Sequence, residues 1–291
     1  MSLRRSSGSL GSLHRFYQAD LVVFCEGGPS LSVEEAVATA QTPPTLDTIF
    51  WTSVIASLGI VKKCHVKSVG SKPTLMSIAD DVEALNIQSV TICLDSDYDR
   101  VSGRASSCRR VAYTFGYSWE NDVLSQPVLE KILACLVGPV PEQARQLLVG
   151  AVTQLEKDLV KWCEIDIALA VRKGIYILNR DKPLSSADMQ SIPPCLGEGK
   201  LTANLRNLGY VRRPKRVVRV IPSDSIRLTF GKLVGRLLYH MVVTFAKQVV
   251  PGVRLDFDMF LRMAIAETFG LIQTGQLQDV GLHYVNQRNA F

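Results

Sequence analysis

The sequence predicts an α/β protein: a mainly parallel sheet flanked by helices, followed by a mostly helical C-terminal domain. Up to about residue 115, short apolar runs of strand length alternate with segments of helical periodicity. Acidic residues follow two of these runs directly, and beyond about residue 125 the periodicity is helical. Such alternation is typical of βαβ units, whose right-handed crossovers produce a parallel sheet.

The elements of the first half follow in order. The run LVVFC at 21–25 predicts a strand buried on both faces of the sheet. A helix is expected over 46–58, with Thr45 or Asp47 available at its start and Gly59 as its stop. The remaining elements are a strand near 64–69, a helix opened by Pro73, a strand over 89–94 and a short strand near 110–114.

The second half is expected to be helical. Its periodic segments lie at 127–137, at 141–177 with room for a break, at 230–249 and at 256–272, and a loop-rich stretch covers 179–200. We therefore expect a flexible N-terminal tail over 1–17, an α/β domain over 18–125 and a helical domain over 126–291. The helical domain contains a basic segment at 206–219.

Composition narrows the class of protein. With 291 residues, 47% of them hydrophobic, the chain can bury a substantial core. Seven scattered cysteines without a CxxC pair are typical of free thiols in a reducing cytoplasm. No run of about 18 apolar residues occurs, so we expect no membrane span. The net charge of +6 suits a polyanionic partner.

Acidic residues follow the first and third predicted strands. Glu26 comes directly after the first, and Asp95 and Asp97 come after the third. Parallel strands end at one edge of the sheet, where ligands of such folds bind. In extended backbone, Asp95 and Asp97 would point to the same side. Carboxylate oxygens select a hard cation, so we expect Mg²⁺ or Mn²⁺ and phosphoryl-transfer chemistry.

Other interpretations of these acids compete with the metal site. A single Glu after a strand, or an Asp pair in a turn, is often only a loop residue, but their joint placement favours a metal site. An EF-hand loop starting at Asp95 is excluded by Arg100 and Ser106. The run TICLDSD also resembles the nucleophile motif of haloacid-dehalogenase phosphatases, without a convincing downstream acidic pair. No GxxxxGK[ST] occurs, so a P-loop is absent.

The segments VFCEGG and CLDSDYD resemble the hallmark motifs of the Toprim superfamily, over roughly residues 20 to 115. The segment GYSWEND, which contains Ser118 and Glu120, resembles a motif of OLD-like Toprim nucleases encoded beside ABC-type ATPases. Over most of its length the chain is similar to the Toprim effectors of PARIS-type anti-phage systems.

The resemblance implies roles for individual residues. Glu26 would be the general base or a metal-positioning acid, and Asp95 and Asp97 the principal metal ligands. Glu120 and Ser118 would complete the site. Lys232 is the candidate catalytic lysine that meets developing phosphate charge, with a solvated residue at a helix start as the alternative.

The resemblance also implies a function. A toxic effector of abortive infection would be held silent by an ABC-type ATPase partner, released when a phage protein is sensed, and would then cleave RNA, with tRNA as the expected substrate and a homodimer as the expected active form. The rival hypothesis is a non-catalytic, metal-binding regulatory subunit of an ATPase complex.

The basic segment supplies a candidate nucleic-acid surface. Its positive residues are Arg212, Arg213, Lys215, Arg216 and Arg219. A local excess of this kind can follow a phosphate backbone. A solvated face and a docking surface for an acidic protein are the alternatives.

Overall fold

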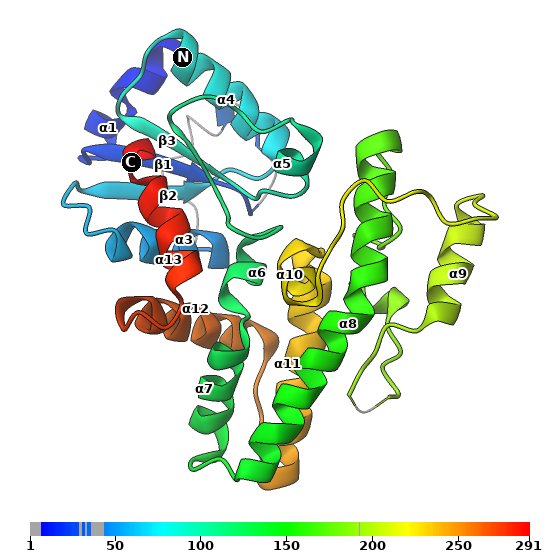
Figure 1. The fold of residues 1–291 in the computed structure, drawn as a ribbon. Coiled ribbons are helices and arrows are strands. Elements are labelled where there is room, and N and C mark those ends of the chain that lie inside the picture. Colours follow the sequence, from blue (N-terminus) through cyan, green and yellow to red (C-terminus); the bar gives the residue numbers. More distant parts are fainter. Residues whose placement is uncertain (1–6, 29–30, 33, 36–43, 192) are drawn as a thin grey trace. The chain divides into compact units, whose positions relative to one another are not determined.

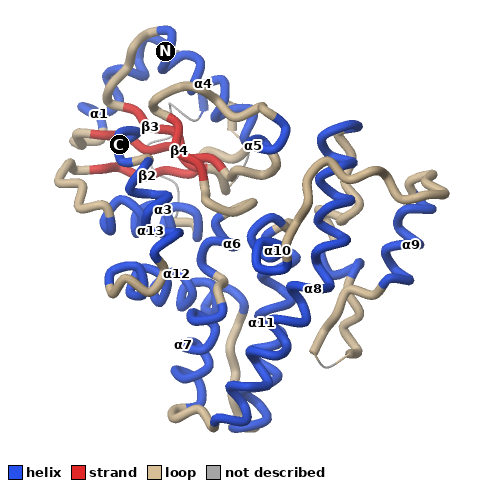
Figure 2. The backbone as a smooth tube through the Cα atoms, viewed as in Figure 1, coloured by secondary structure: helices blue, strands red, loops and turns tan. Residues whose placement is uncertain are grey.

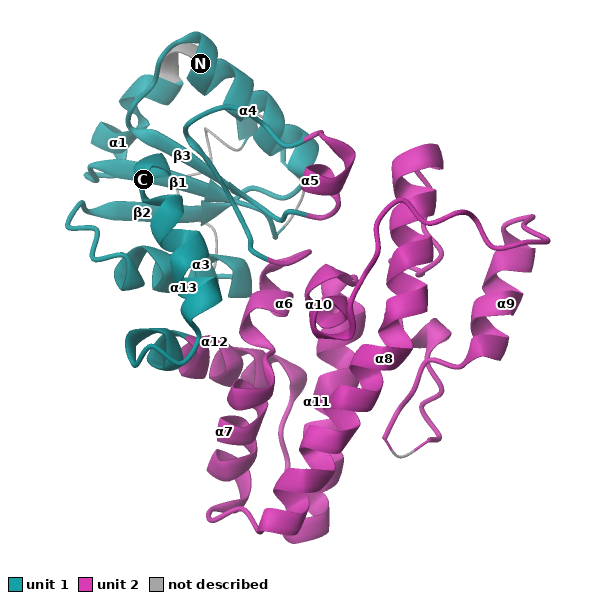
Figure 3. Ribbon diagram, viewed as in Figure 1, with its two compact units in different colours: residues 1–96, 105–115, 269–291 teal, residues 97–104, 116–268 magenta. Residues whose placement is uncertain are grey.

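The computed structural model describes residues 7–28, 31–32, 34–35, 44–191 and 193–291. The chain divides into two compact units, coloured separately in Figure 3. Unit 1 comprises residues 1–96, 105–115 and 269–291, and unit 2 comprises 97–104 and 116–268. The units thus divide the chain differently from the expected segments 18–125 and 126–291.

Unit 1 is built around a four-stranded sheet in which all neighbouring strands are parallel (Figures 1 and 2). The strand order is β2-β1-β3-β4. The strands are β1 (Leu21–Cys25), β2 (Cys64–Ser68), β3 (Val90–Leu94) and β4 (Val111–Tyr113). Every residue of β1 and β3 is buried, as expected for central strands covered on both faces. The predicted α/β class is confirmed.

Two helices of unit 1 follow the strands in the expected places. They are α3 (Leu46–Ser57) and α4 (Lys72–Ala84), the latter with Pro73 in its first turn. Thr45 caps α3, because its Oγ1 accepts from the amide of Thr48 while Thr48 Oγ1 accepts from the amide of Thr45. Asp47 is therefore not the residue that caps this helix.

The N-terminal residues include ordered structure that the sequence analysis assigned to a flexible tail. The turn η1 (Ser7–Ser12) leads into the short helix α1 (Leu13–Phe16). Leu10 and Leu13 are buried in the hydrophobic core beside β1, β3 and α4. The apolar side chains of this serine-rich segment provide the reason for its order; residues 1–6 lie outside the described residues.

The C-terminal residues also belong to unit 1, where they cover the outer edge of β4. Helix α13 (Gln278–Asn286) and the turn η3 (Arg288–Ala290) flank Gln287. The Gln287 side chain accepts from the backbone amide of Tyr113 at 2.7 Å and donates to its carbonyl oxygen at 2.9 Å. One amide side chain thus takes the place of a neighbouring strand at Tyr113.

Unit 2 is helical, which confirms the expected helical C-terminal region. Leu233, Leu237 and Met241 form a buried stripe on one face of α11, and this helix packs against α7 and α8. The helices are α5 (Asp99–Ser102), α6 (Trp119–Val123), α7 (Gln126–Val137), α8 (Glu142–Lys173), α9 (Glu198–Asn207), α10 (Pro222–Leu228) and α11 (Gly231–Val249), with a turn η2 (Pro183–Ser186). Helix α12 (Phe257–Gln273) belongs to unit 2 up to Thr268 and to unit 1 from Phe269.

Two details of unit 2 differ from expectation. Helix α8 runs for 32 residues without a break, and the helices α9 and α10 were not expected. Among the described residues, no helix has the length and apolar character needed to cross a membrane.

Candidate metal centre

Glu26 and Asp95 lie at the same edge of the sheet in unit 1. Strands β1 and β3 are parallel neighbours with Cys25 opposite Cys93, so the residues that follow them are brought together. The backbone amide of Asp95 donates a hydrogen bond to Oε1 of Glu26 at 2.8 Å. The structure therefore places these two predicted residues side by side.

A third carboxylate, which the sequence analysis considered only as a helix cap, lies at the same edge. Gly27 has a φ of +98°, a conformation that favours glycine. A Cβ at Gly27 would lie 2.3 Å from Oδ2 of Asp47, so only glycine leaves room for this side chain. Thr45 caps α3, so the Asp47 carboxylate is not needed as the cap. It lies instead against Gly27 in the loop that follows β1. An Asp in the first turn of a helix is common, so the sequence did not identify Asp47 as a residue of the candidate metal centre.

The negative charges of Glu26, Asp95 and Asp47 affect the pKa of one buried thiol, that of Cys25. The pKa of Cys25 is raised well above its usual value, first by burial and then by the charges of Asp47, Asp95 and Glu26, with a contribution from Cys93. Each carboxylate disfavours a further negative charge there. The carboxyl edge of the sheet in unit 1 is therefore a region of concentrated negative charge.

The backbone leaves the extended conformation at Asp97, where a turn begins. Ser96 is fixed in unit 1, where its amide donates to Oγ1 of Thr114 at 2.9 Å. Asp97 belongs to unit 2 and has a φ of +44°, in the left-handed region that Asp tolerates better than most residues. The expectation of extended backbone through this pair is wrong.

Glu120 lies on α6 in unit 2 with a buried side chain. Burial raises its pKa, the charge of Asp97 raises it further, and a hydrogen bond from Ser118 and the charge of Lys232 oppose the shift. Oγ of Ser118 lies 2.6 Å from Oε2 of Glu120. Four predicted residues of unit 2, including the exposed Lys232 on α11, therefore share one electrostatic environment.

The start of α6, which carries Ser118 and Glu120, is hydrogen-bonded to the end of α10 and the connection to α11. Asn121 Nδ2 donates to the carbonyl oxygens of Ile226 at 2.6 Å and Thr229 at 2.8 Å. A Cβ at Gly231 would lie 2.0 Å from Oγ of Ser118. Gly231, next to Lys232, is thus required by close approach, and no local pattern in the sequence distinguishes it from other glycines.

The predicted ligands occur in two sets: Glu26 and Asp95, with Asp47, in unit 1, and Asp97 and Glu120 in unit 2. Among the residues that the structure describes, no three or more His, Cys, Asp or Glu side chains form a group arranged to hold a metal ion. All the donors in both sets are carboxylate oxygens, which fit a hard divalent cation such as Mg²⁺ or Mn²⁺.

The basic segment is irregular in structure, and its positive side chains are solvent-exposed. Arg213 forms an ion pair with Glu198, and Arg216 lies 3.9 Å from Glu164. The carbonyl oxygen of Lys215 accepts a hydrogen bond from Arg172 at 2.7 Å. All five predicted residues are exposed: Arg212, Arg213, Lys215, Arg216 and Arg219.

No family model matches the chain, and no curated protein matches it significantly.

Proposed function

We propose that the chain is a Mg²⁺- or Mn²⁺-dependent nuclease that uses carboxylates to bind metal: Glu26 and Asp95 in unit 1, and Asp97 and Glu120 in unit 2. The observation that carries the proposal is the placement of Glu26, Asp95 and Asp47 where parallel strands end: the Asp95 amide donates to Glu26, and the Asp47 carboxylate lies against Gly27. Carboxylates crowded in this way repel one another unless a cation neutralises them. Divalent cations at such sites serve phosphoryl transfer.

When bound, the cation would polarise a phosphate oxygen and lower the pKa of a water molecule. The protein's own residues would orient that chemistry. The amide of Asp95 holds the Glu26 carboxylate in one orientation, and Ser118 does the same for Glu120. Lys232 carries a positive charge near Glu120, where it would offset charge that develops on phosphate.

Nucleic acid is the proposed substrate because the basic segment exposes five positive side chains in a single irregular stretch. The narrower proposals come from the Toprim resemblance: tRNA as the substrate, an ABC-type ATPase as the partner that holds the chain silent, a homodimer as the active form, and abortive infection as the role. All seven cysteines are free, which suits the proposed cytoplasmic location.

The test is cleavage of labelled total tRNA and of DNA by the full chain, with Mg²⁺ or Mn²⁺ and with EDTA. We expect cutting of tRNA by the wild type and loss of cutting in Glu26→Gln and Asp95→Asn. Glu83→Gln, which removes an exposed carboxylate from α4, is the matched control and should cut normally.

The contrary outcome is also informative. If the wild type cuts neither nucleic acid, while Mn²⁺ binding is measurable and is lost in Glu26→Gln, the chain is a metal-binding regulatory subunit and the nuclease proposal fails.

A further inference from the structure

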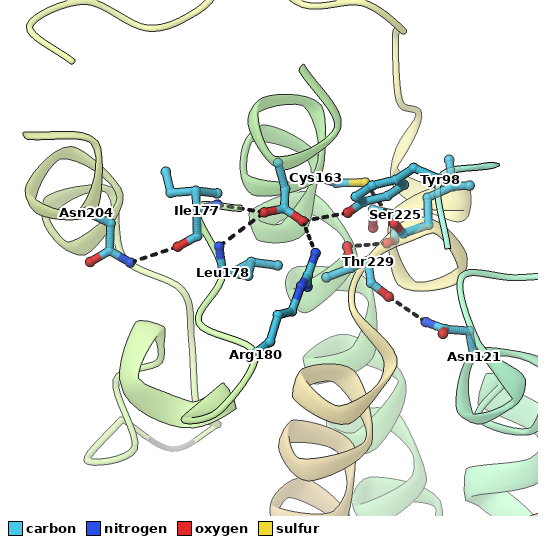
Figure 4. A network of polar contacts seen from close by, with 11 residues as sticks. Tyr98, Asn121, Cys163, Ile177, Leu178, Arg180, Asn204, Ser225 and Thr229 are labelled. Carbon is cyan, nitrogen blue, oxygen red and sulfur yellow. Dashed lines mark hydrogen bonds and ion pairs between the residues drawn. The ribbon is translucent and has the colours of Figure 1, made fainter. Parts of the chain in front are cut away.

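A buried carboxylate in unit 2 lies at the centre of a polar network outside the proposed ligand set. Asp166 on α8 is fully buried. Its Oδ1 accepts from the amides of Ile177 at 2.8 Å and Leu178 at 3.1 Å. Its Oδ2 accepts from the hydroxyl of Tyr98 at 2.7 Å and from Arg180 at 2.6 Å. Figure 4 shows the hydroxyl of Tyr98, the guanidinium of Arg180 and the backbone of Ile177 and Leu178 directed at the carboxylate in the centre of this network.

Arg180 completes the network through both charge and ring contacts. Its guanidinium lies 4.2 Å from the ring centroid of Tyr176, 4.3 Å from that of Phe230 and 5.2 Å from that of Tyr117. Nε and Nη1 are buried and make no hydrogen bond to any residue that the structure describes. Attraction of the cation to the surrounding rings compensates part of that loss.

The aromatic partners of this pair are sequence neighbours of the proposed site residues. Tyr98 follows Asp97 directly, and the carbonyl oxygen of Tyr117 accepts from the amide of Asp97 at 2.7 Å. Tyr117 directly precedes Ser118 and lies three residues before Glu120. Phe230 precedes Gly231, one residue before Lys232. Three separate segments of unit 2 therefore meet at one ion pair.

We infer that Arg180 and Asp166 form a positioning pair, which fixes the backbone that carries Asp97, Glu120 and Lys232. The inference rests on the proposed function. Neither residue is assigned contact with metal or substrate: they act through Tyr98, Tyr117 and Phe230.

The chemistry of the pair suits positioning better than stabilisation. A buried ion pair adds little net stability compared with apolar residues of the same volume. A carboxylate that accepts four hydrogen bonds, and a planar guanidinium between rings, instead restrict their neighbours to one arrangement. Lysine has no planar group with which to stack on the rings, so Arg180→Lys keeps the charge but loses that restriction.

The first test uses metal-free protein. Amide hydrogen exchange at Asp97 and Tyr117 is compared in the wild type, Arg180→Lys and Tyr98→Phe, which removes one hydroxyl donor and retains the ring. Thr268→Val is the control, because Thr268 is also buried in unit 2 and donates to a carbonyl oxygen, that of Val123, at 3.2 Å. We expect faster exchange in the first two variants and no change in the control.

The second test measures Mn²⁺ affinity and the maximal rate of tRNA cleavage. Loss of a group that orients metal ligands typically costs about 10- to 100-fold in affinity or activity. We expect a loss of that order in Arg180→Lys and Tyr98→Phe, and values within about twofold of wild type in Thr268→Val.

The outcomes separate the two proposals. If the wild type cleaves RNA and Arg180→Lys and Tyr98→Phe match Thr268→Val in exchange, affinity and rate, the positioning pair is refuted and the nuclease proposal stands. If the wild type cleaves nothing, but both variants still show faster exchange and weaker Mn²⁺ binding, the nuclease proposal fails and the positioning pair stands.

Discussion

The amide of Asp95 donates to Oε1 of Glu26, so the acid that follows β1 is oriented by the backbone that follows β3. This bond separates two roles of Glu26. Glu26→Gln retains an acceptor oxygen but removes the charge, whereas Glu26→Ala removes both. We expect both variants to lose cleavage, and only Glu26→Ala to lose about 1–3 kcal/mol of stability, because it leaves the Asp95 amide without this acceptor. Urea unfolding checks the stability, and equal destabilisation of both variants would contradict this account.

Asp47 tests whether the negative charge at the sheet edge serves metal binding. Asp47→Asn keeps the shape of the side chain beside Gly27 but removes one of the charges that raise the pKa of Cys25. We expect Mn²⁺ affinity to fall about 10- to 100-fold, as for other groups around a metal site. Asp80→Asn, at an exposed position on α4, should bind as the wild type does. Equal affinities for both variants would remove Asp47 from the site.

Gly231 tests the close approach between α11 and the loop of Ser118. In Gly231→Ala the new methyl group would lie 2.0 Å from Oγ of Ser118, so the loop or the helix must move. We expect a loss of about 1–3 kcal/mol in urea unfolding, together with reduced cleavage. Gly150→Ala, in α8, should be neutral or stabilising, because apart from the adjacent backbone of its own helix no described atom lies within 4 Å of the new Cβ. Wild-type stability in both variants would refute the packing argument.

Because of Lys67 on β2, we expect the stability of the folded protein to depend on pH. Its side chain is buried, and burial lowers its pKa from 10.5 to about 8. A lysine with a lowered pKa in the folded state destabilises the fold when charged, so the penalty grows as pH falls from 10.5 to 8 and is constant below. Lys67→Met should therefore gain thermal stability relative to wild type as pH falls through this window. The exposed Lys63→Met should show no such trend. A gain that is independent of pH would contradict the lowered pKa.

The basic segment predicts a salt-dependent interaction. Replacing Arg212, Lys215 and Arg219 by Ala should weaken tRNA binding and reduce the slope of log Kd against log salt, because each phosphate contact contributes to that slope. Replacing the exposed Lys131, Lys157 and Lys247 by Ala removes the same charge from α7, α8 and α11. Binding of labelled tRNA at several salt concentrations compares the two. Equal effects would mean that net charge alone attracts the RNA.

The sheet could be predicted closely because its signals are local. The apolar run at 21–25 is β1, and the run expected over 89–94 contains β3. A parallel strand that is buried on both faces requires such an apolar run, and the run can be recognised in the sequence. The placement of Glu26 beside Asp95 then follows from parallel pairing.

The rest depends on contacts between residues far apart in the chain. Asp166 lies in a long helix whose charged residues are mostly exposed, and only its partners, such as Tyr98 and Arg180, distinguish it. The sequence left Thr45 and Asp47 as alternative caps of α3, because the reciprocal hydrogen bonds between Thr45 and Thr48 depend on the local backbone. The left-handed conformation of Asp97 could not be predicted from the two-residue spacing between Asp95 and Asp97 either.

The return of residues 269–291 to unit 1 has a consequence for synthesis. During translation, β4 emerges with Tyr113 long before Gln287 is added, so the outer edge of the sheet stays unpaired while most of unit 2 is made. Unit 1 reaches the form described above only after α13 and Gln287 have left the ribosome. A nascent chain that stops before Gln287 therefore lacks the side chain that covers the edge of its sheet at Tyr113, and a chain proposed to be toxic would not complete unit 1 until that residue has been made.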